Sequence, residues 1–301
     1  MRTAIILAGG RGNRFRNALN SDKLLARIGG EVVLRRTASV VADMAEDLIL
    51  AVDEWERGRR YLKLLEDIAD FRIVTDIEPS FSSPLMGFVS GIMASRGKYL
   101  IVIPGDAAYV KREELSPLIH EVESGNSECS VPVYEGYVQT LFQALLADKA
   151  KRIARLLLEY NWRKPDGFIR GSSNVSYLKF SPVSEGFSPF RTINSPEDIM
   201  DYSRRAQVIL EGVIRLSLSD SLHLIEAPVR SKEEALSLYE RLMEEGSFFW
   251  AGVVSSVWKG LEEISTRAFM EEKRFMEEIG LKSLALHAEK DANRVMSRKS
   301  T

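Results

Sequence analysis

Three glycines and two cations near the start of the chain have the types and spacing of a phosphate-binding turn. Gly9, Gly10 and Gly12 follow an apolar run that is typical of a buried strand, and Arg14 and Lys23 come shortly after them. Glycines lack a Cβ atom, so backbone N–H groups can crowd around an anion, and the cations can neutralise its remaining charge. The pattern predicts a nucleoside triphosphate site. An ordinary turn from a strand into a helix is the alternative interpretation.

Two better-known glycine loops do not match this turn. The dinucleotide fingerprint needs a third glycine where Phe15 stands. The P-loop needs a Lys-Ser or Lys-Thr pair directly after its second glycine, where Asn13 and Arg14 stand. The sequence therefore points to phosphate chemistry outside these two classes.

An aspartate follows a second apolar run. Residues 99–103 are typical of a fully buried strand, and Gly105 and Asp106 come after its carboxyl end. Active sites of open α/β sheets lie beyond the carboxyl ends of the strands, and Mg²⁺ takes one or two carboxylates together with phosphate oxygens. Asp106 is therefore the candidate magnesium ligand. The alternative is a cap for a helix that starts near Lys111.

The segment between these two motifs carries Asp76 and then Pro84, Leu85 and Gly87, which open a short apolar helix. Pro84 after Ser83 is the usual start of a helix. A helix N-terminus also favours anions, so a structural role and a nucleotide-binding role are compatible here.

These motifs, in this order, resemble the nucleotidyltransferases with a glycosyltransferase-A-like fold, and most closely the molybdenum cofactor guanylyltransferases. The resemblance covers residues 1–203. It implies that Arg14 and Lys23 stabilise the leaving pyrophosphate and that Asp106 binds Mg²⁺. It also implies nucleotide-binding roles for Leu7, Ala8, Gly9, Gly10, Gly12, Asp76, Pro84, Leu85 and Gly87.

Two later segments extend the resemblance. Residues 138–142 are similar to the family's Gln-Pro-Leu segment, and residues 190–198 are similar to its Asn-x-Asn-Thr-Pro-x-Asp motif. Asn194 matches the second asparagine and is expected to assist the metal or the acceptor, whereas Asp198 fits a structural role in a helix start. The sequence departs from the family's motifs at Ser83, Ala108, Thr140 and Thr192.

The composition is that of an ordinary globular protein. Hydrophobic residues make up 45% of the 301 residues and charged residues 28%, and the formal charge is −2. This balance gives no electrostatic case for binding nucleic acid or an anionic membrane. A single cysteine, three scattered histidines and the lack of a long apolar stretch give no sign of a disulfide, a zinc cluster or a membrane span. A cytoplasmic location is expected.

Strand-like and helix-like patterns alternate up to residue 203, which predicts an α/β fold with a mostly parallel sheet flanked by helices. This region is the expected nucleotidyltransferase domain. The expected strands are 3–7, 48–52, 72–75, 99–103, 128–133 and 175–180, and the expected helices are 34–45, 54–68, 87–95 and 113–124.

Residues 204–301 are expected to form an all-helical domain of unknown role. Residues 231–245, 248–278 and 281–298 are rich in helix-forming residues at helical spacing. The apolar block from Phe248 to Trp258 is more typical of a packed bundle than of a partner-binding face. The domain could dimerise the protein, shield the acceptor site or bind another protein.

Together these observations predict a Mg²⁺-dependent nucleotidyltransferase. The expected reaction moves GMP from GTP to a small phosphate acceptor such as molybdopterin and releases pyrophosphate. Sugar phosphates and cobinamide phosphate are alternative acceptors, and CTP is an alternative nucleotide. A non-catalytic nucleotide sensor, or a protein whose main function lies in the helical region, would also be compatible with the motifs.

Overall fold

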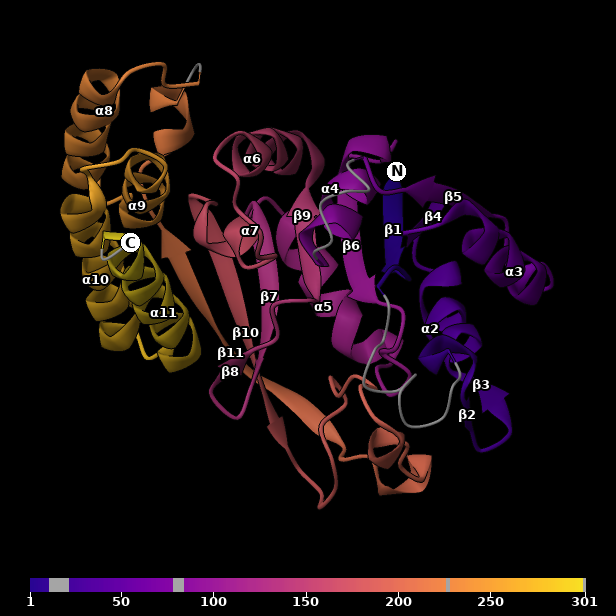
Figure 1. Cartoon of the computed structure of the whole chain (residues 1–301). Coiled ribbons are helices and arrows are strands. Elements are labelled where there is room, and N and C mark those ends of the chain that lie inside the picture. The colour runs from indigo at the N-terminus through magenta and orange to yellow at the C-terminus, as the bar shows by residue number, and fades with distance from the viewer. Residues whose placement is uncertain (11–21, 78–83, 226–227, 300–301) are drawn as a thin grey trace.

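The computed structural model describes residues 1–10, 22–77, 84–225 and 228–299. A central sheet with helices packed against it forms most of the molecule (Figure 1). The strands in the middle of this sheet are apolar because both of their faces are covered. The strands are β1 (Arg2–Leu7), β2 (Arg27–Ile28), β3 (Glu31–Val32), β4 (Asp47–Val52), β5 (Phe71–Thr75), β6 (Tyr99–Pro104), β7 (Cys129–Tyr134), β8 (Tyr137–Val138), β9 (Gln143–Leu146), β10 (Asn174–Pro182) and β11 (Val208–Ser217).

The sheet has the order β11-β10-β7-β9-β6-β1-β4-β5, with β8 paired to β7 and a separate small hairpin of β2 and β3. β1, β4, β5 and β6 pair in parallel, as do β7 and β10, whereas β9 and β11 run antiparallel to their neighbours. The expectation of a mostly parallel sheet is confirmed.

Helices cover both faces of this sheet. Along β1, Ala4 and Ile6 face one apolar core and Ile5 faces the other, as the period of two in a strand requires. One core contains α2, α3 and α5, and the other contains α4, α6 and the C-terminal helices. The helices are α2 (Val33–Ala42), α3 (Trp55–Leu65), α4 (Pro84–Ala94), α5 (Arg112–Glu123), α6 (Ala147–Glu159), α7 (Gly167–Arg170), α8 (Lys232–Glu244), α9 (Phe248–Ser256), α10 (Glu262–Glu278) and α11 (Lys282–Lys299).

The six expected strands and the four expected helices up to residue 124 are confirmed, with shifts of a few residues at their ends. The strands β9 and β11 and the helix α6 were not predicted. β9 is only four residues long, and its apolar run continues directly into α6, so the pattern gives no boundary between them.

The region after residue 203 differs from the sequence prediction in one way. Residues 208–217 form strand β11, which pairs with β10 along its whole length, so this part of the chain is not helical. The helix-rich stretch over residues 248–278 holds two helices, α9 and α10, and Gly260, with a φ of 87°, lies between them.

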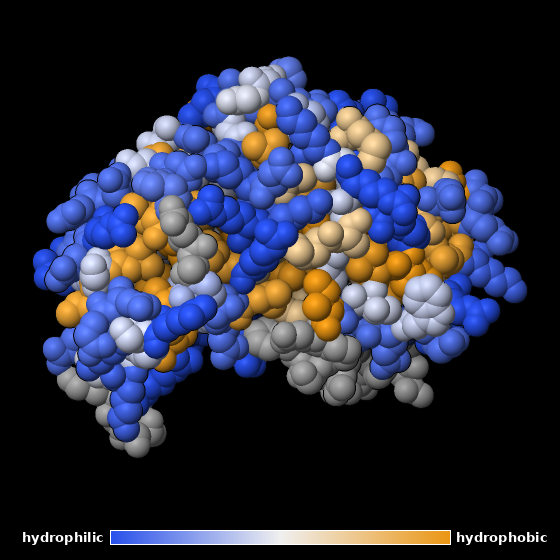
Figure 2. Space-filling model, turned by 90° about the horizontal axis from the view of Figure 1, so that it is seen from above, coloured by the Kyte–Doolittle hydropathy of each residue, from blue (hydrophilic) through white to orange (hydrophobic). Residues whose placement is uncertain are grey.

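The C-terminal helices pack at the β10–β11 end of the sheet (Figure 1). Phe249 and Trp250 of the apolar block are buried, as are Val253 and Val254, so the block is packed rather than exposed. Hydrophilic side chains cover most of the face seen from above, with apolar atoms visible between them (Figure 2). No helix within the described residues is both long enough and apolar enough to span a membrane.

Candidate functional site

The carboxyl ends of β1, β4, β5 and β6 meet at one edge of the sheet, and the predicted site residues follow them. Ala8 N donates to Ala51 O at 2.7 Å, and Gly105 N donates to Leu7 O at 2.9 Å. These bonds continue the sheet for one residue beyond β1 and hold the turn after β1 beside the turn after β6. Gly9 and Asp106 therefore both follow strands that end at this edge of the sheet.

The glycines of the first turn meet two different requirements. A Cβ atom on Gly9 would lie 3.1 Å from the backbone nitrogen of Asp53, so a side chain there would press on the end of β4. Gly10 has a φ of 99°, which favours glycine, and open space surrounds the position of its missing Cβ. The turn therefore exposes backbone at Gly10. Gly12 and Arg14 lie outside the described residues.

Lys23 and Asp106 form a direct ion pair, with Nζ 2.5 Å from Oδ2. Lys23 opens a short 3-10 helix whose preceding residue, Asp22, accepts a hydrogen bond from Leu24 N at 3.1 Å. The Asp106 side chain is only 7% exposed. Burial raises the pKa of Asp106, and the charge of Lys23 opposes that rise. The two predicted catalytic residues are therefore brought together across 83 positions of sequence.

Arg57 is a residue of the site that the sequence prediction missed. Its Nη1 donates to Gly10 O at 2.8 Å and to Asp53 Oδ1 at 3.0 Å, and its Nε lies 3.2 Å from Asp22 Oδ2. Tyr61 OH also donates to Asp22 Oδ2, at 2.5 Å. Arg57 thus ties Gly10 to Asp22, one on each side of residues 11–21. The spacing of Asp53 and Arg57 on one helical turn was the available signal.

Asp76 follows β5 and lies near the end of β4. Its backbone nitrogen donates to Val52 O at 3.2 Å. Burial, together with the nearby charge of Asp53, raises the pKa of Asp76 to about 6. The two carboxylates therefore lie close enough to repel each other, and Asp76 is ionised at neutral pH.

The residues predicted at the start of α4 have clear structural roles. The Leu85 side chain is fully buried in the apolar core, so only its backbone could meet a ligand. A Cβ atom on Gly87 would lie 3.3 Å from Leu7 Cδ2, which shows how closely α4 packs on β1. Pro84 is the first residue of α4, as expected. The nucleotide-binding roles of these three residues stay predictions.

Asn194 is exposed and lies in the segment between β10 and β11. Its Nδ2 donates to Thr192 Oγ1 at 3.1 Å, and its backbone nitrogen donates to Asp198 Oδ2 at 2.9 Å. Asp198 also accepts from Ser195 N at 2.8 Å and pairs with Arg191, as expected of a residue that caps a helix start. The charge of Asp198 also contributes to the raised pKa of Asp106.

Two segments lie on the β9 side of β6, the strand whose carboxyl end leads to Asp106. Gln143 at the start of β9 pairs with Val102 of β6, four residues before Asp106. Phe142 stacks edge-on against Phe190 with 5.4 Å between ring centroids. This contact joins residues 137–143, here called the rim segment, to the segment that carries Asn194.

The residues present fit a magnesium ion that is bound mainly by its substrates. Across the described part of the chain, no group of three or more His, Cys, Asp or Glu residues could hold a metal alone. Asp106 offers one carboxylate at the sheet edge, and Mg²⁺ commonly takes one or two carboxylates with phosphate oxygens and water. Asp106 is thus the described residue that would hold the ion.

Comparison with known proteins gives one consistent family. The MobA-like NTP transferase domain matches residues 4–170. The probable molybdenum cofactor guanylyltransferase of Methanosarcina acetivorans is 30% identical over 206 residues, which cover 66% of this chain and 88% of that protein. The corresponding protein of Methanocaldococcus jannaschii is 26% identical over 205 residues, which cover 65% and 96%.

A solved structure shows the same fold. The inositol-1-phosphate CTP transferase from T. maritima superposes with a TM-score of 0.50 at 16% identity, and the match covers 67% of this chain and 94% of that one. The family match spans more than half of the 301 residues and contains the glycine turn, Lys23 and Asp106. The chain therefore belongs to the MobA-like NTP transferase family and is a nucleotidyltransferase.

Proposed function

We propose that the enzyme transfers GMP from GTP to molybdopterin, or to a small phosphate acceptor of similar chemistry, and releases pyrophosphate. The observation that carries this proposal is the pair between Lys23 and Asp106, the latter in the turn after β6. Arg57 ties Asp22, the residue before Lys23, to the exposed backbone of Gly10. The relatives named as molybdenum cofactor guanylyltransferases support the choice of nucleotide and acceptor. A cytoplasmic location, expected from the composition, is part of the same proposal.

The nucleotide half of the site lies over β1, β4 and β5. The turn at Gly9 and Gly10 offers backbone to the phosphates, and Arg57 fixes the Gly10 carbonyl. Asp76 presents a carboxylate that is ionised at neutral pH and can only accept hydrogen bonds. Guanine presents adjacent N1–H and N2–H donors, which one carboxylate can accept together. This complementarity supports GTP over nucleotides whose bases lack such a donor pair.

The acceptor would then lie toward β9, whose first residue pairs with β6, and toward the segment that carries Asn194, which Phe190 joins to the rim segment. Transfer needs the acceptor phosphate and the α-phosphate of GTP in contact, so the two substrates must flank Asp106. The rim segment and residues 190–194 then form the acceptor wall. The exposed amide of Asn194 is available there to contact the acceptor.

The reaction forms one bond and breaks one. An oxygen of the acceptor phosphate attacks the α-phosphorus of GTP, and the bond from that phosphorus to the bridging oxygen of the β-phosphate breaks. A bound Mg²⁺ would neutralise charge on the phosphate oxygens. Lys23 supplies the protein's own positive charge beside the pyrophosphate that leaves. Positioning and charge neutralisation supply most of the catalysis in such transfers.

The test measures pyrophosphate release from GTP, CTP, ATP and UTP with Mg²⁺ and molybdopterin, and with inositol 1-phosphate as a second acceptor. We expect release with GTP and molybdopterin, and a loss of at least 100-fold in kcat for Asp106→Asn. Asp67→Asn, which changes an exposed carboxylate paired with Arg35, is the matched control and should keep full activity. Release with another pair would correct the substrates, and nucleotide binding without any release would favour a sensor.

A further inference from the structure

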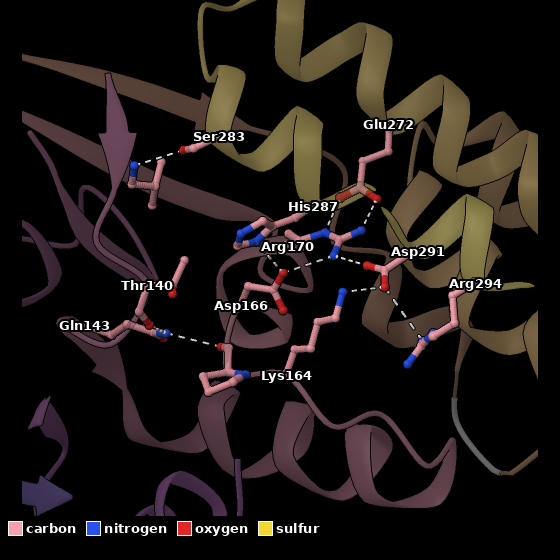
Figure 3. Close-up of polar contacts among 12 residues, drawn as sticks. Thr140, Gln143, Lys164, Asp166, Arg170, Glu272, Ser283, His287, Asp291 and Arg294 are labelled. Atoms are coloured by element: carbon pink, nitrogen blue, oxygen red, sulfur yellow. Dashed lines mark hydrogen bonds and ion pairs between the residues drawn. The ribbon is translucent and has the colours of Figure 1, made fainter. Parts of the chain in front are cut away.

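A buried cluster of charges joins the transferase fold to the C-terminal helices. Arg170 of α7 has a side chain with no exposed surface. Its Nε and Nη2 each lie 2.7 Å from a carboxylate oxygen of Glu272 on α10, and its Nη1 lies 2.8 Å from Asp291 of α11 and 3.1 Å from Asp166 (Figure 3). Lys164 also pairs with Asp291, at 2.6 Å. α10 and α11 are therefore fastened to α7 by ion pairs shielded from water.

Hydrogen bonds to backbone carbonyls connect this cluster to the rim segment. His287 Nδ1 of α11 lies 2.9 Å from Asp166 Oδ2. The preceding residue, Pro165, accepts a hydrogen bond from Gln143 Nε2 at 3.2 Å, and the same amide donates to Thr140 O at 2.6 Å (Figure 3). Gln143 is fully buried, so these bonds are protected from exchange with water. Gln143 therefore holds residues 140–143 against the loop that precedes α7.

A second link reaches the rim segment directly from α11. Val138 N of β8 donates to Ser283 Oγ at 2.9 Å, 145 positions away in the sequence. In Figure 3 the Ser283 bond lies above His287, and the Gln143 bonds lie below it. The short strand β8 holds only two residues against β7. Ser283 therefore supplies an attachment that the sheet itself provides only weakly.

The C-terminal helices are also part of the apolar interior of the transferase fold. Trp162, next to α6, stacks edge-on against Phe249 of α9 at 5.1 Å, and Trp250 Nε1 donates to Gly171 O at 2.9 Å. Both tryptophans are about 1% exposed. A loosely attached accessory module would not share its core with the sheet in this way.

We propose that α11 positions the acceptor wall of the active site, with Ser283 and His287 as its positioning residues. Ser283 holds the backbone at Val138, and His287 holds Asp166 and through it the loop whose Pro165 carbonyl receives Gln143. The inference rests on the proposed function in one respect, because it takes the rim segment to be the wall that the acceptor meets. It predicts that changes in α11 alter use of the acceptor but leave nucleotide binding unchanged.

The first experiment replaces Ser283 with alanine in the full-length enzyme and measures steady-state kinetics with GTP and molybdopterin. Losing one hydrogen bond to the rim segment should raise the acceptor KM about three- to tenfold, with the KM for GTP and the Kd for GTP unchanged within twofold. Ser283→Thr keeps the oxygen and should restore the acceptor KM. Ser297→Ala is the matched control, because Ser297 lies on the same helix, is exposed, and donates to Arg294 O within that helix.

A second variant, His287→Ala, tests the path through Asp166 and should raise the acceptor KM in the same way. Equal changes in the GTP and acceptor constants would overturn the proposal, since they would indicate a general loss of structure. So would an unchanged acceptor KM in both variants.

Amide hydrogen exchange provides a readout that needs no acceptor. Ser283→Ala should speed exchange in residues 137–143 at least fivefold, while peptides covering β1 and residues 105–107 keep their protection. An enzyme that releases no pyrophosphate with any acceptor would refute the proposed function, and the exchange result would still decide whether α11 holds the rim segment. Unchanged exchange in residues 137–143 would refute the positioning role.

Discussion

Replacing Arg170 with methionine should destabilise the protein strongly and in a pH-dependent manner. Methionine has similar length and no charge, so the change removes the ion pairs and leaves most of the packing. Asp166 keeps His287, and Asp291 keeps Lys164, but Arg170 is the only cation within ion-pair distance of Glu272 in the described part of the chain. Removing one partner of a buried ion pair costs about 3–5 kcal/mol, because the remaining charge is left without compensation.

The pH dependence follows from Glu272. Burial raises the pKa of Glu272, and the charge of Arg170 opposes that rise, so the variant should have a much higher Glu272 pKa than the native protein. The folded variant then holds a proton that the unfolded chain has released. Its free energy of unfolding should fall as pH rises above the ordinary glutamate pKa of about 4.3, by up to about 1.4 kcal/mol per pH unit.

Urea unfolding followed by tryptophan fluorescence measures this loss, since Trp162 lies 5.4 Å from the Arg170 guanidinium. The loss should be larger at pH 8 than at pH 5. Arg170→Met combined with Glu272→Leu should lose less than Arg170→Met alone, because no unpaired charge remains at Glu272. Lys273 is the next residue of α10, and its side chain pairs with Glu289 of α11 at the partly exposed surface, so Lys273→Met should change stability little. A loss below about 1 kcal/mol at pH 7, or one that is equal at both pH values, would refute the reasoning.

Three further predictions concern the site and its support. Lys23→Ala should lower kcat by about 100- to 1000-fold in steady-state kinetics, because no other described residue offers a cation to Asp106. The Asp76 carboxyl should titrate near pH 6 by NMR. Because its pKa is raised on folding, the free energy of unfolding should decrease as pH rises from about 4 to 6, and Asp76→Asn should remove this decrease. Gly91→Ala should lower the unfolding free energy by about 1–3 kcal/mol in urea titrations, because its Cβ would lie 2.5 Å from Ile5 Cγ2.

The parallel part of the sheet could be predicted from the sequence because each of its strands is an isolated apolar run. The runs at 48–52 and 99–103 are bounded by polar or turn residues, so their ends are visible in the pattern. β11 could not be found in this way. Its residues are mostly exposed or half-buried, and only pairing with β10 makes them a strand.

The site was predictable to the extent that its residues follow strand ends. Lys23 and Asp106 carry the family's motif, and their side chains form an ion pair. Arg57 had no such marker, because a helical arginine four residues after an aspartate is usually a surface pair. Its role depends on burial beside Asp22 and Gly10, which are 35 and 47 positions away in the sequence. Sequence spacing alone cannot supply that proximity.

The role of α11 could be derived only from contacts across the whole chain. Arg170 is the last residue of the family match, and its partners Glu272 and Asp291 lie about 100 and 120 positions further on. In the sequence these carboxylates look like ordinary helix-surface charges. A charged side chain without exposed surface is stable only when it is paired, so the helices that bring Glu272 and Asp291 are required for the fold of α7. The loop before α7 in turn accepts the hydrogen bond from Gln143 of the rim segment, so our proposal makes the C-terminal helices part of the catalytic unit rather than an addition to it.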